Sequence, residues 1–234
     1  GPDPLIRAHH LACGHTPGQT VVTLPELIVR RGARIGILGR NGTGKTTLIR
    51  TLIGELPPLS GELTRASTLD TGYLAQEQIE DLRPDESPLQ HLSRLAPQER
   101  EQVLRGWLGR FGFPGDDALR PTGPMSGGEK TRLCLALLAW EKPGFLVLDE
   151  PTSALDLTVQ LQVLKLLVSL QQKYGLSYLL ITHDMGVIRA LAHRLLVMKD
   201  GAVEEQGAVE EIFMTPASAY TRELLAASAW RDAV

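Results

Sequence analysis

The chain has 234 residues, 43% of them apolar and 22% charged, and its formal net charge is −3. This composition is ordinary for a folded globular domain, and the slight acidity argues against a nucleic-acid binder driven by overall basicity. No apolar run approaches the length of a membrane span, and the only two cysteines lie far apart, which favours a reducing compartment. We therefore expect a cytoplasmic protein with no transmembrane segment and no direct DNA binding.

Strand and helix patterns alternate along the chain, with one helical interruption. Residues 5–38 are β-rich. Strands are expected at 21–29, 34–38, 71–75, 145–148 and 178–182, a hairpin at 195–198 and 202–205, and helices at 45–53, 126–140, 156–174, 185–192 and over the last thirty residues. Residues 79–124 are charged, have helical spacing and contain several prolines, which predicts a small helical lobe. The alternation elsewhere predicts an α/β fold with a parallel-sheet core.

A glycine-rich segment follows the strand predicted at 34–38. It reads Gly39-Arg40-Asn41-Gly42-Thr43-Gly44-Lys45-Thr46, which fits the phosphate-binding pattern G-x-x-x-x-G-K-[ST] between a strand and a helix. Glycines let backbone N–H groups surround phosphates, and the helix N-terminus adds a favourable dipole. Lys45 is predicted to contact the β/γ-phosphates, and the Thr46 hydroxyl to bind Mg²⁺. When the loop is empty, we expect the Lys45 side chain to be largely solvated.

Two carboxylates end the apolar strand predicted at 145–148. Ligands of open α/β sheets bind at the carboxyl ends of strands. Asp149 can hold Mg²⁺ there through water, and Glu150 can orient or deprotonate the water that attacks ATP. By itself, an acidic turn after a core strand would explain this pair equally well, but the phosphate-binding loop favours the functional interpretation.

A second helix start carries small polar residues. Ser126 can act as the N-cap of the helix predicted at 126–140, and Glu129 can complete a capping box. This capping role is a sufficient structural explanation. The alternative is that Gly127 and Gly128 also make a second anion site at the helix N-terminus.

Together these motifs resemble those of the ABC (ATP-binding cassette) ATPase family, over essentially the whole chain. The segment from Met125 to Glu129 is similar to the family signature, with Met in place of Leu. Three further residues match family motifs in the expected order: Gln76 of the Q-loop, Asp156 of the D-loop and His183, the switch histidine. The family also has an aromatic residue that stacks on adenine. By register that position falls near His15, where a plain loop residue is an equal alternative.

The resemblance implies a single ABC domain over residues 1–234. Residues 5–78 and 126–234 would form a P-loop NTPase core with a mainly parallel sheet and an N-terminal antiparallel β subdomain, and residues 79–125 an inserted helical lobe. The implied cofactors are ATP and Mg²⁺. The implied catalytic residues are Glu150, His183 and Gln76, and the implied metal ligands are Thr46, Gln76 and Asp149. The implied nucleotide-binding residues are Gly39, Asn41, Gly42, Gly44, Lys45, Thr46, Thr47, Ser126, Gly127, Gly128, Asp156 and His15.

The two ends of the chain resemble different branches of the family. Residues 39–149 are similar to the second ABC domain of ABC-F translation factors, and residues 150–229 to ATPase subunits of dipeptide and oligopeptide importers. Such a mosaic suggests a recombined or engineered chimera, or a divergent relative. The resemblance implies an ATPase that forms a head-to-tail homodimer when it binds ATP. Two alternatives are an ABC-F fragment that engages the ribosome and an energy-coupling subunit that engages the membrane subunits of a peptide importer.

Overall fold

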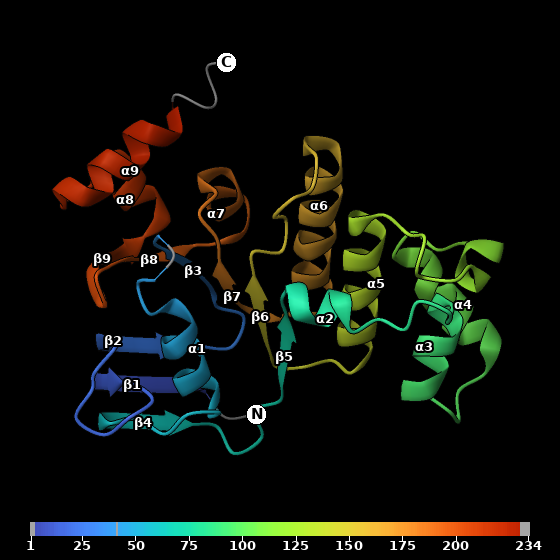
Figure 1. Cartoon of the computed structure of the whole chain (residues 1–234), viewed down its shortest axis with the longest axis horizontal. Helices are drawn as coiled ribbons and strands as arrows, with labels where there is room; N and C mark the ends of the chain where they lie inside the picture. The colour runs from blue at the N-terminus through green and yellow to red at the C-terminus, as the bar shows by residue number, and fades with distance from the viewer. Residues whose placement is uncertain (1–2, 41, 230–234) are drawn as a thin grey trace. The chain divides into compact units, whose positions relative to one another are not determined.

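A computed structural model describes residues 3–40 and 42–229 of the chain (Figure 1). The chain divides into two compact units. The first unit comprises Gly1–Thr71, Gly144–Val147 and Gly175–Val234, and the second comprises Gly72–Pro143 and Leu148–Tyr174. Within the described residues, no helix combines the length and the apolar character that crossing a membrane requires.

The first unit contains a small antiparallel sheet, as the N-terminal pattern predicted. Its strands are β1 (Ile6–Cys13), β2 (Val22–Val29) and β4 (Ser60–Arg65), in the order β2-β1-β4. In β1 and β2 the alternation of buried and exposed residues changes phase in mid-strand. In β1 this change occurs at His10, whose φ of 46° lies in the left-handed region.

Strand β4 was not predicted from the sequence. Its residues are almost all exposed, because β4 is an edge strand that pairs only with β1 in this sheet. An exposed edge strand has no apolar alternation, so the period-2 signal that identifies half-buried strands is missing.

The first unit also contains a larger sheet with strands in the order β7-β3-β8-β9. Strands β3 (Arg34–Leu38), β7 (Ser177–Ile181) and β8 (Arg194–Lys199) are parallel, and β9 (Ala202–Ala208) returns antiparallel to β8. Their central residues are buried on both faces, which explains their continuous apolar runs. The predicted hairpin is confirmed: Asp200 and Gly201 turn between β8 and β9 with φ of 48° and 77°.

Helices of the first unit follow the predicted pattern. They are α1 (Lys45–Ile53), α7 (Met185–Leu191), α8 (Val209–Met214) and α9 (Ala219–Ala229). The left-handed glycine Gly54 ends α1, as the sequence predicted. Asp184 caps α7 by accepting hydrogen bonds from the backbone N–H groups of Gly186 and Val187 at 2.8 and 3.2 Å.

The second unit is mostly helical, as predicted for residues 79–124. It contains most of β5 (Thr71–Leu74), the end of β6 (Phe145–Asp149), α2 (Gln76–Glu80), α3 (Pro88–Leu95), α4 (Glu101–Arg110), the 3₁₀ helix η1 (Gly115–Leu119), α5 (Gly127–Trp140) and α6 (Leu157–Tyr174). Trp107 of α4 packs against the rings of Phe111, Trp140 and Tyr174. Its indole N–H donates to the Ala136 carbonyl of α5 at 2.9 Å, which ties α4 to α5.

Candidate nucleotide-binding and catalytic residues

The glycine-rich loop connects β3 to α1 in the first unit, in the strand–loop–helix context that the motif requires. Gly42 and Gly44 have φ of 83° and 88°, so both need the left-handed conformation that glycine adopts without strain. A Cβ on Gly44 would lie 2.9 Å from Val22 Cβ, so β2 leaves no room for a side chain there. Thr43 closes the loop by donating its hydroxyl to the Arg40 carbonyl at 2.9 Å. Asn41 lies outside the described residues.

Lys45 is the first residue of α1, and the expectation of a solvated side chain is wrong. The residue is buried, and its ammonium donates a hydrogen bond to the Gly39 carbonyl at the start of the same loop. The loop curls tightly enough for its first carbonyl to accept a donor from its seventh residue. The next residue, Thr46, is exposed and Thr47 is buried.

His15 lies beside the first turn of α1. Its Nε2 is 3.3 Å from the hydroxyl oxygen of Thr47, and the residue as a whole is exposed. The histidine therefore adjoins the phosphate-binding loop, although 32 residues separate the two contacting side chains in the sequence. Its stacking on adenine stays a prediction.

His183 follows the buried strand β7 and is exposed. A cavity of about 330 Å³ has His183 and Gly39 among its lining residues, so the switch histidine and the start of the glycine-rich loop face the same space. The far wall comes from α9, through Leu224, Ala227 and Ser228. Sequence reasoning did not connect α9 with this region, because no motif marks the helix.

The predicted carboxylates lie in the second unit, at the end of β6. Asp149 accepts a hydrogen bond at 3.1 Å from the hydroxyl of Tyr73 on β5. Glu150 has a φ of 48°, a strained conformation for a residue with a side chain and one that recurs at functional sites. Sequence reasoning assigned no role to Tyr73, which lies three residues before Gln76. Gln76 itself begins α2, is exposed, and donates to Glu80 Oε1 at 3.3 Å.

The signature residues form the N-terminus of α5 in the second unit. Ser126 is the N-cap, because its hydroxyl oxygen accepts the backbone N–H of Glu129 at 3.2 Å. Burial raises the pKa of Glu129, but hydrogen bonding and charge from Arg120 outweigh this effect and leave that pKa lowered. Ser126 and Gly127 are exposed and Gly128 is buried, so the helix presents its first residues to solvent.

Asp156, the predicted D-loop residue, precedes α6. Its carboxylate accepts the backbone N–H of Val159 at 2.9 Å, which makes it a capping group for that helix. The side chain is exposed. Sequence reasoning assigned Asp156 only to the nucleotide site, and the capping bond is a second, structural use of the same carboxylate.

The predicted magnesium ligands suit that ion by donor type. Thr46, Gln76 and Asp149 supply a hydroxyl, an amide oxygen and a carboxylate, which are the hard oxygen donors that Mg²⁺ prefers together with water and phosphate oxygens. By donor type alone, the three residues fit Mg²⁺. Over residues 3–40 and 42–229, no group of three or more His, Cys, Asp or Glu side chains is placed to hold a metal ion.

Comparison with known proteins identifies the family. Residues 24–153 match the family described as ABC transporter. The chain belongs to the ABC transporter ATP-binding family. Its fold agrees: the solved structure of cbiO1 from Clostridium perfringens, part of the ABC transporter complex cbiONQ, has a TM-score of 0.81 and 28% identity, with 92% of each chain covered. This match confirms the predicted α/β fold with its antiparallel N-terminal sheet and helical elements.

Two curated relatives match most of the chain. The probable ATP-binding protein YheS of Escherichia coli K12 is 44% identical over 203 residues, which are 87% of this chain but only 31% of YheS. The probable D,D-dipeptide transport ATP-binding protein DdpF of the same strain is 36% identical over 208 residues, 86% of this chain and 68% of DdpF. The chain is thus an ABC nucleotide-binding domain of a family of ATPases, and it spans less than a third of YheS.

Proposed function

We propose that the chain hydrolyses Mg·ATP at the interface of a head-to-tail homodimer. The observation that carries the proposal is the glycine-rich loop, where Gly42 and Gly44 in the left-handed conformation lead into the N-terminus of α1. Backbone N–H groups at such a terminus attract phosphate. A second helix N-terminus of the same kind, at α5, exposes Ser126 and Gly127. In a head-to-tail dimer this terminus of one chain would close over the γ-phosphate held by the other.

Each predicted site residue has a defined role in this proposal. The loop from Gly39 to Thr47 binds the phosphates, with Lys45 leaving the Gly39 carbonyl to contact them. Glu150 orients or deprotonates the attacking water, and His183 and Gln76 contact the γ-phosphate and the water. Thr46, Asp149 and Gln76 would hold Mg²⁺, which would supply positive charge beside the phosphates. His15 stacks on the adenine, and Asp156 contributes to the nucleotide site.

The same proposal covers organisation and partners. A single ABC domain would comprise a core of residues 5–78 and 126–234 and a helical lobe of residues 79–125, in a cytoplasmic protein that is peripheral to any membrane. The similarity to DdpF, a probable dipeptide transport ATP-binding protein, favours a transport complex as the partner, and the ABC-F-like motifs of residues 39–149 favour the ribosome. The apparent switch between branches near residue 150 is also the motive for proposing a chimeric chain.

Trapping the dimer tests the proposal. Glu150→Gln keeps the size of the side chain and removes the carboxylate that activates water, so ATP binding should persist while hydrolysis stops. We expect multi-angle light scattering to show wild type monomeric with Mg·ADP and Glu150→Gln dimeric with Mg·ATP. The matched control is Glu99→Gln, which changes an exposed glutamate of the helical lobe and should behave as wild type.

Two results would contradict the dimer mechanism. One is a Glu150→Gln protein that remains monomeric at saturating Mg·ATP. The other is a wild-type specific activity that does not depend on protein concentration in a preparation shown to be monomeric, because a composite site must lose activity on dilution.

A further inference from the structure

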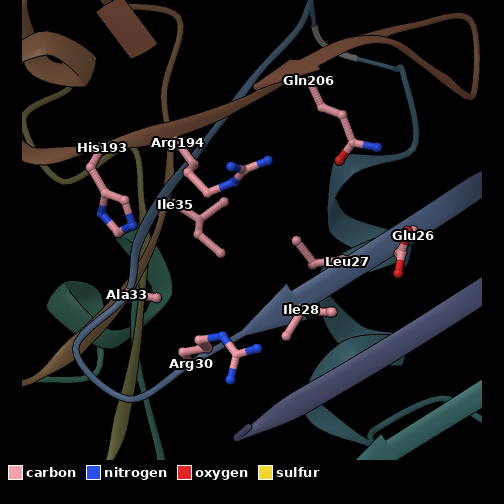
Figure 2. Close-up of a pocket in the computed structure, with 9 residues that line it drawn as sticks. All are labelled: Glu26, Leu27, Ile28, Arg30, Ala33, Ile35, His193, Arg194 and Gln206. Carbon is pink, nitrogen blue, oxygen red and sulfur yellow. The ribbon is translucent and has the colours of Figure 1, made fainter. Parts of the chain in front are cut away.

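A cavity of about 490 Å³ lies in the first unit, away from the glycine-rich loop (Figure 2). Its volume is within the range of about 300–1,000 Å³ that is typical of small-molecule sites. The lining residues come from β2, the turn after it, β3, the residue before β8, β8 and β9, and none has a role in the proposed ATPase. They are Glu26, Leu27, Ile28, Arg30, Ala33, Ile35, His193, Arg194 and Gln206.

The cavity forms because two sheet edges meet at only one end. Strand β2 is an edge of the small sheet, and β9 is an edge of the larger sheet. The edges are joined where the Thr23 N–H, near the start of β2, donates to the Gly201 carbonyl of the β8–β9 turn at 2.8 Å. Residues nearer the opposite ends, Leu27 and Gln206 among them, line the cavity. The space is thus a wedge between two sheets.

This wedge lies at the opposite end of the sheet from the phosphate-binding loop. Ile35 and Arg194, at the amino ends of β3 and β8, line the cavity, whereas the loop follows the carboxyl end of β3. Gly39 is four positions after Ile35 in the sequence, which corresponds to about 13 Å along a strand. A ligand in the wedge would therefore not occupy the nucleotide site.

Positive charge and apolar surface meet in the cavity. In Figure 2 the guanidinium groups of Arg30 and Arg194 are directed into the space. Ile28 is the half-buried apolar residue of the lining, whereas Leu27 and Ile35 behind it are almost fully buried. Arg30 forms an ion pair with Asp3 at 3.4 Å, and both side chains of that pair are well exposed. Such an exposed pair is weak, so a ligand anion can compete with Asp3 for Arg30.

His193 adds a neutral hydrogen-bond donor to the two arginines that line the cavity. Burial, followed by the charges of Arg34 and Arg194, lowers the pKa of His193, so the ring is neutral at neutral pH. Its Nδ1 accepts the backbone N–H of Arg34 at 3.1 Å, which leaves the ring proton on Nε2 as a donor. Among the lining residues that the structure describes, Glu26 is the only acidic one.

We propose that this wedge binds a small organic anion with a compact apolar body. The guanidinium groups of Arg194 and Arg30 hold the carboxylate or phosphate group of the ligand, because the planar fork of arginine matches those anions with paired hydrogen bonds. Ile28, the half-buried apolar residue of the lining, contacts the apolar body.

A matched pair of probes tests the ligand class. 2-Naphthoate carries an anion on an apolar body, and 2-naphthalenemethanol has the same body without the charge. In ligand-observed NMR titrations of the full chain, we expect saturable binding of naphthoate and at least about threefold weaker binding of the alcohol, the size of an exposed ion-pair contribution. Excess Mg·ADP should not displace naphthoate. Equal binding of both probes, no saturable binding of naphthoate, or displacement by Mg·ADP would overturn the proposal.

Three substitutions, each of an exposed charged residue, test whether naphthoate binds in the wedge. Arg194→Gln should weaken naphthoate binding about threefold or more, and Glu26→Gln should strengthen it, because one removes an attractive and the other a repulsive charge. Arg7→Gln, at an exposed arginine of β1 outside the cavity, should leave the affinity unchanged. Binding that is indifferent to Arg194 and Glu26, or equally sensitive to Arg7, would mean that the wedge is not the site.

Discussion

Gly127 and Gly128, the two glycines of the signature, are expected to differ in how far replacement by alanine changes stability. A Cβ built on Gly128 would lie 2.1 Å from Val159 Cγ1 of α6, whereas one built on Gly127 would lie 3.4 Å from Leu155 Cδ2. Carbon atoms pack at about 3.5–4.0 Å, so in Gly128→Ala the Val159 side chain or the two helices must shift by more than an ångström, and Gly127→Ala only needs a small adjustment. Neither glycine has a positive φ, so alanine meets no backbone strain at either position.

The free energies follow from this geometry. Overpacking a close contact costs about 1–3 kcal/mol, and replacing glycine by alanine in a helix gains up to about 1 kcal/mol in both variants. We therefore expect Gly128→Ala to be less stable than Gly127→Ala by about 1–3 kcal/mol. For a chain of this size that difference corresponds to a Tm lower by about 2–12 °C.

Urea and thermal unfolding, followed by circular dichroism without nucleotide, measure the difference. The double variant Gly128→Ala/Val159→Ala removes the methyl group that collides, so the cost of Gly128→Ala should shrink in the Val159→Ala background. Equal stability of the two glycine variants, or an undiminished cost in that background, would refute the claim that the close approach of α5 and α6 requires Gly128.

Further predictions concern the loop, a thiol and a helix cap. Lys45→Ala should abolish tight ATP binding in titration calorimetry and lower the free energy of unfolding by about 1 kcal/mol, because the hydrogen bond to the Gly39 carbonyl is lost. Lys45→Met should also lose ATP binding, but its side chain still fills the buried space. Burial raises the pKa of Cys134 from 9.0 to about 12, so Ellman's reagent at pH 8 should label this thiol only after denaturation, and rapid labelling of Cys134 in the native protein would contradict its burial. Because the pKa is higher in the folded than in the unfolded protein, the contribution of this thiol to stability is lost as the pH rises from about 9 towards 12. Asp184→Ala should destabilise α7 by about 1 kcal/mol, measured by urea unfolding, and Asp184→Asn, which keeps an acceptor, should recover most of that loss.

Local sequence patterns were sufficient for most elements and for the motifs. The loop from Gly39 to Thr46 and the cap Ser126 are recognisable because neighbouring residues determine a loop conformation or a capping bond. The hairpin at Asp200 and Gly201 was predictable for the same reason, since two consecutive left-handed residues are a local requirement. The family and fold followed from the order of these local signals along the chain.

Contacts between distant segments could not be predicted in this way. The burial of Lys45 depends on how tightly the whole loop closes, and the need for glycine at position 128 depends on Val159 of another helix. Strand β4 has no apolar alternation because it lies at a sheet edge, and the wedge beside Arg194 exists only because β2 and β9 meet at one end. The sequence by itself therefore determined the family and its motifs, whereas tertiary packing decided which side chains are buried, which glycines lack space for a methyl group and where a second cavity opens, since these depend on residues far apart in the chain.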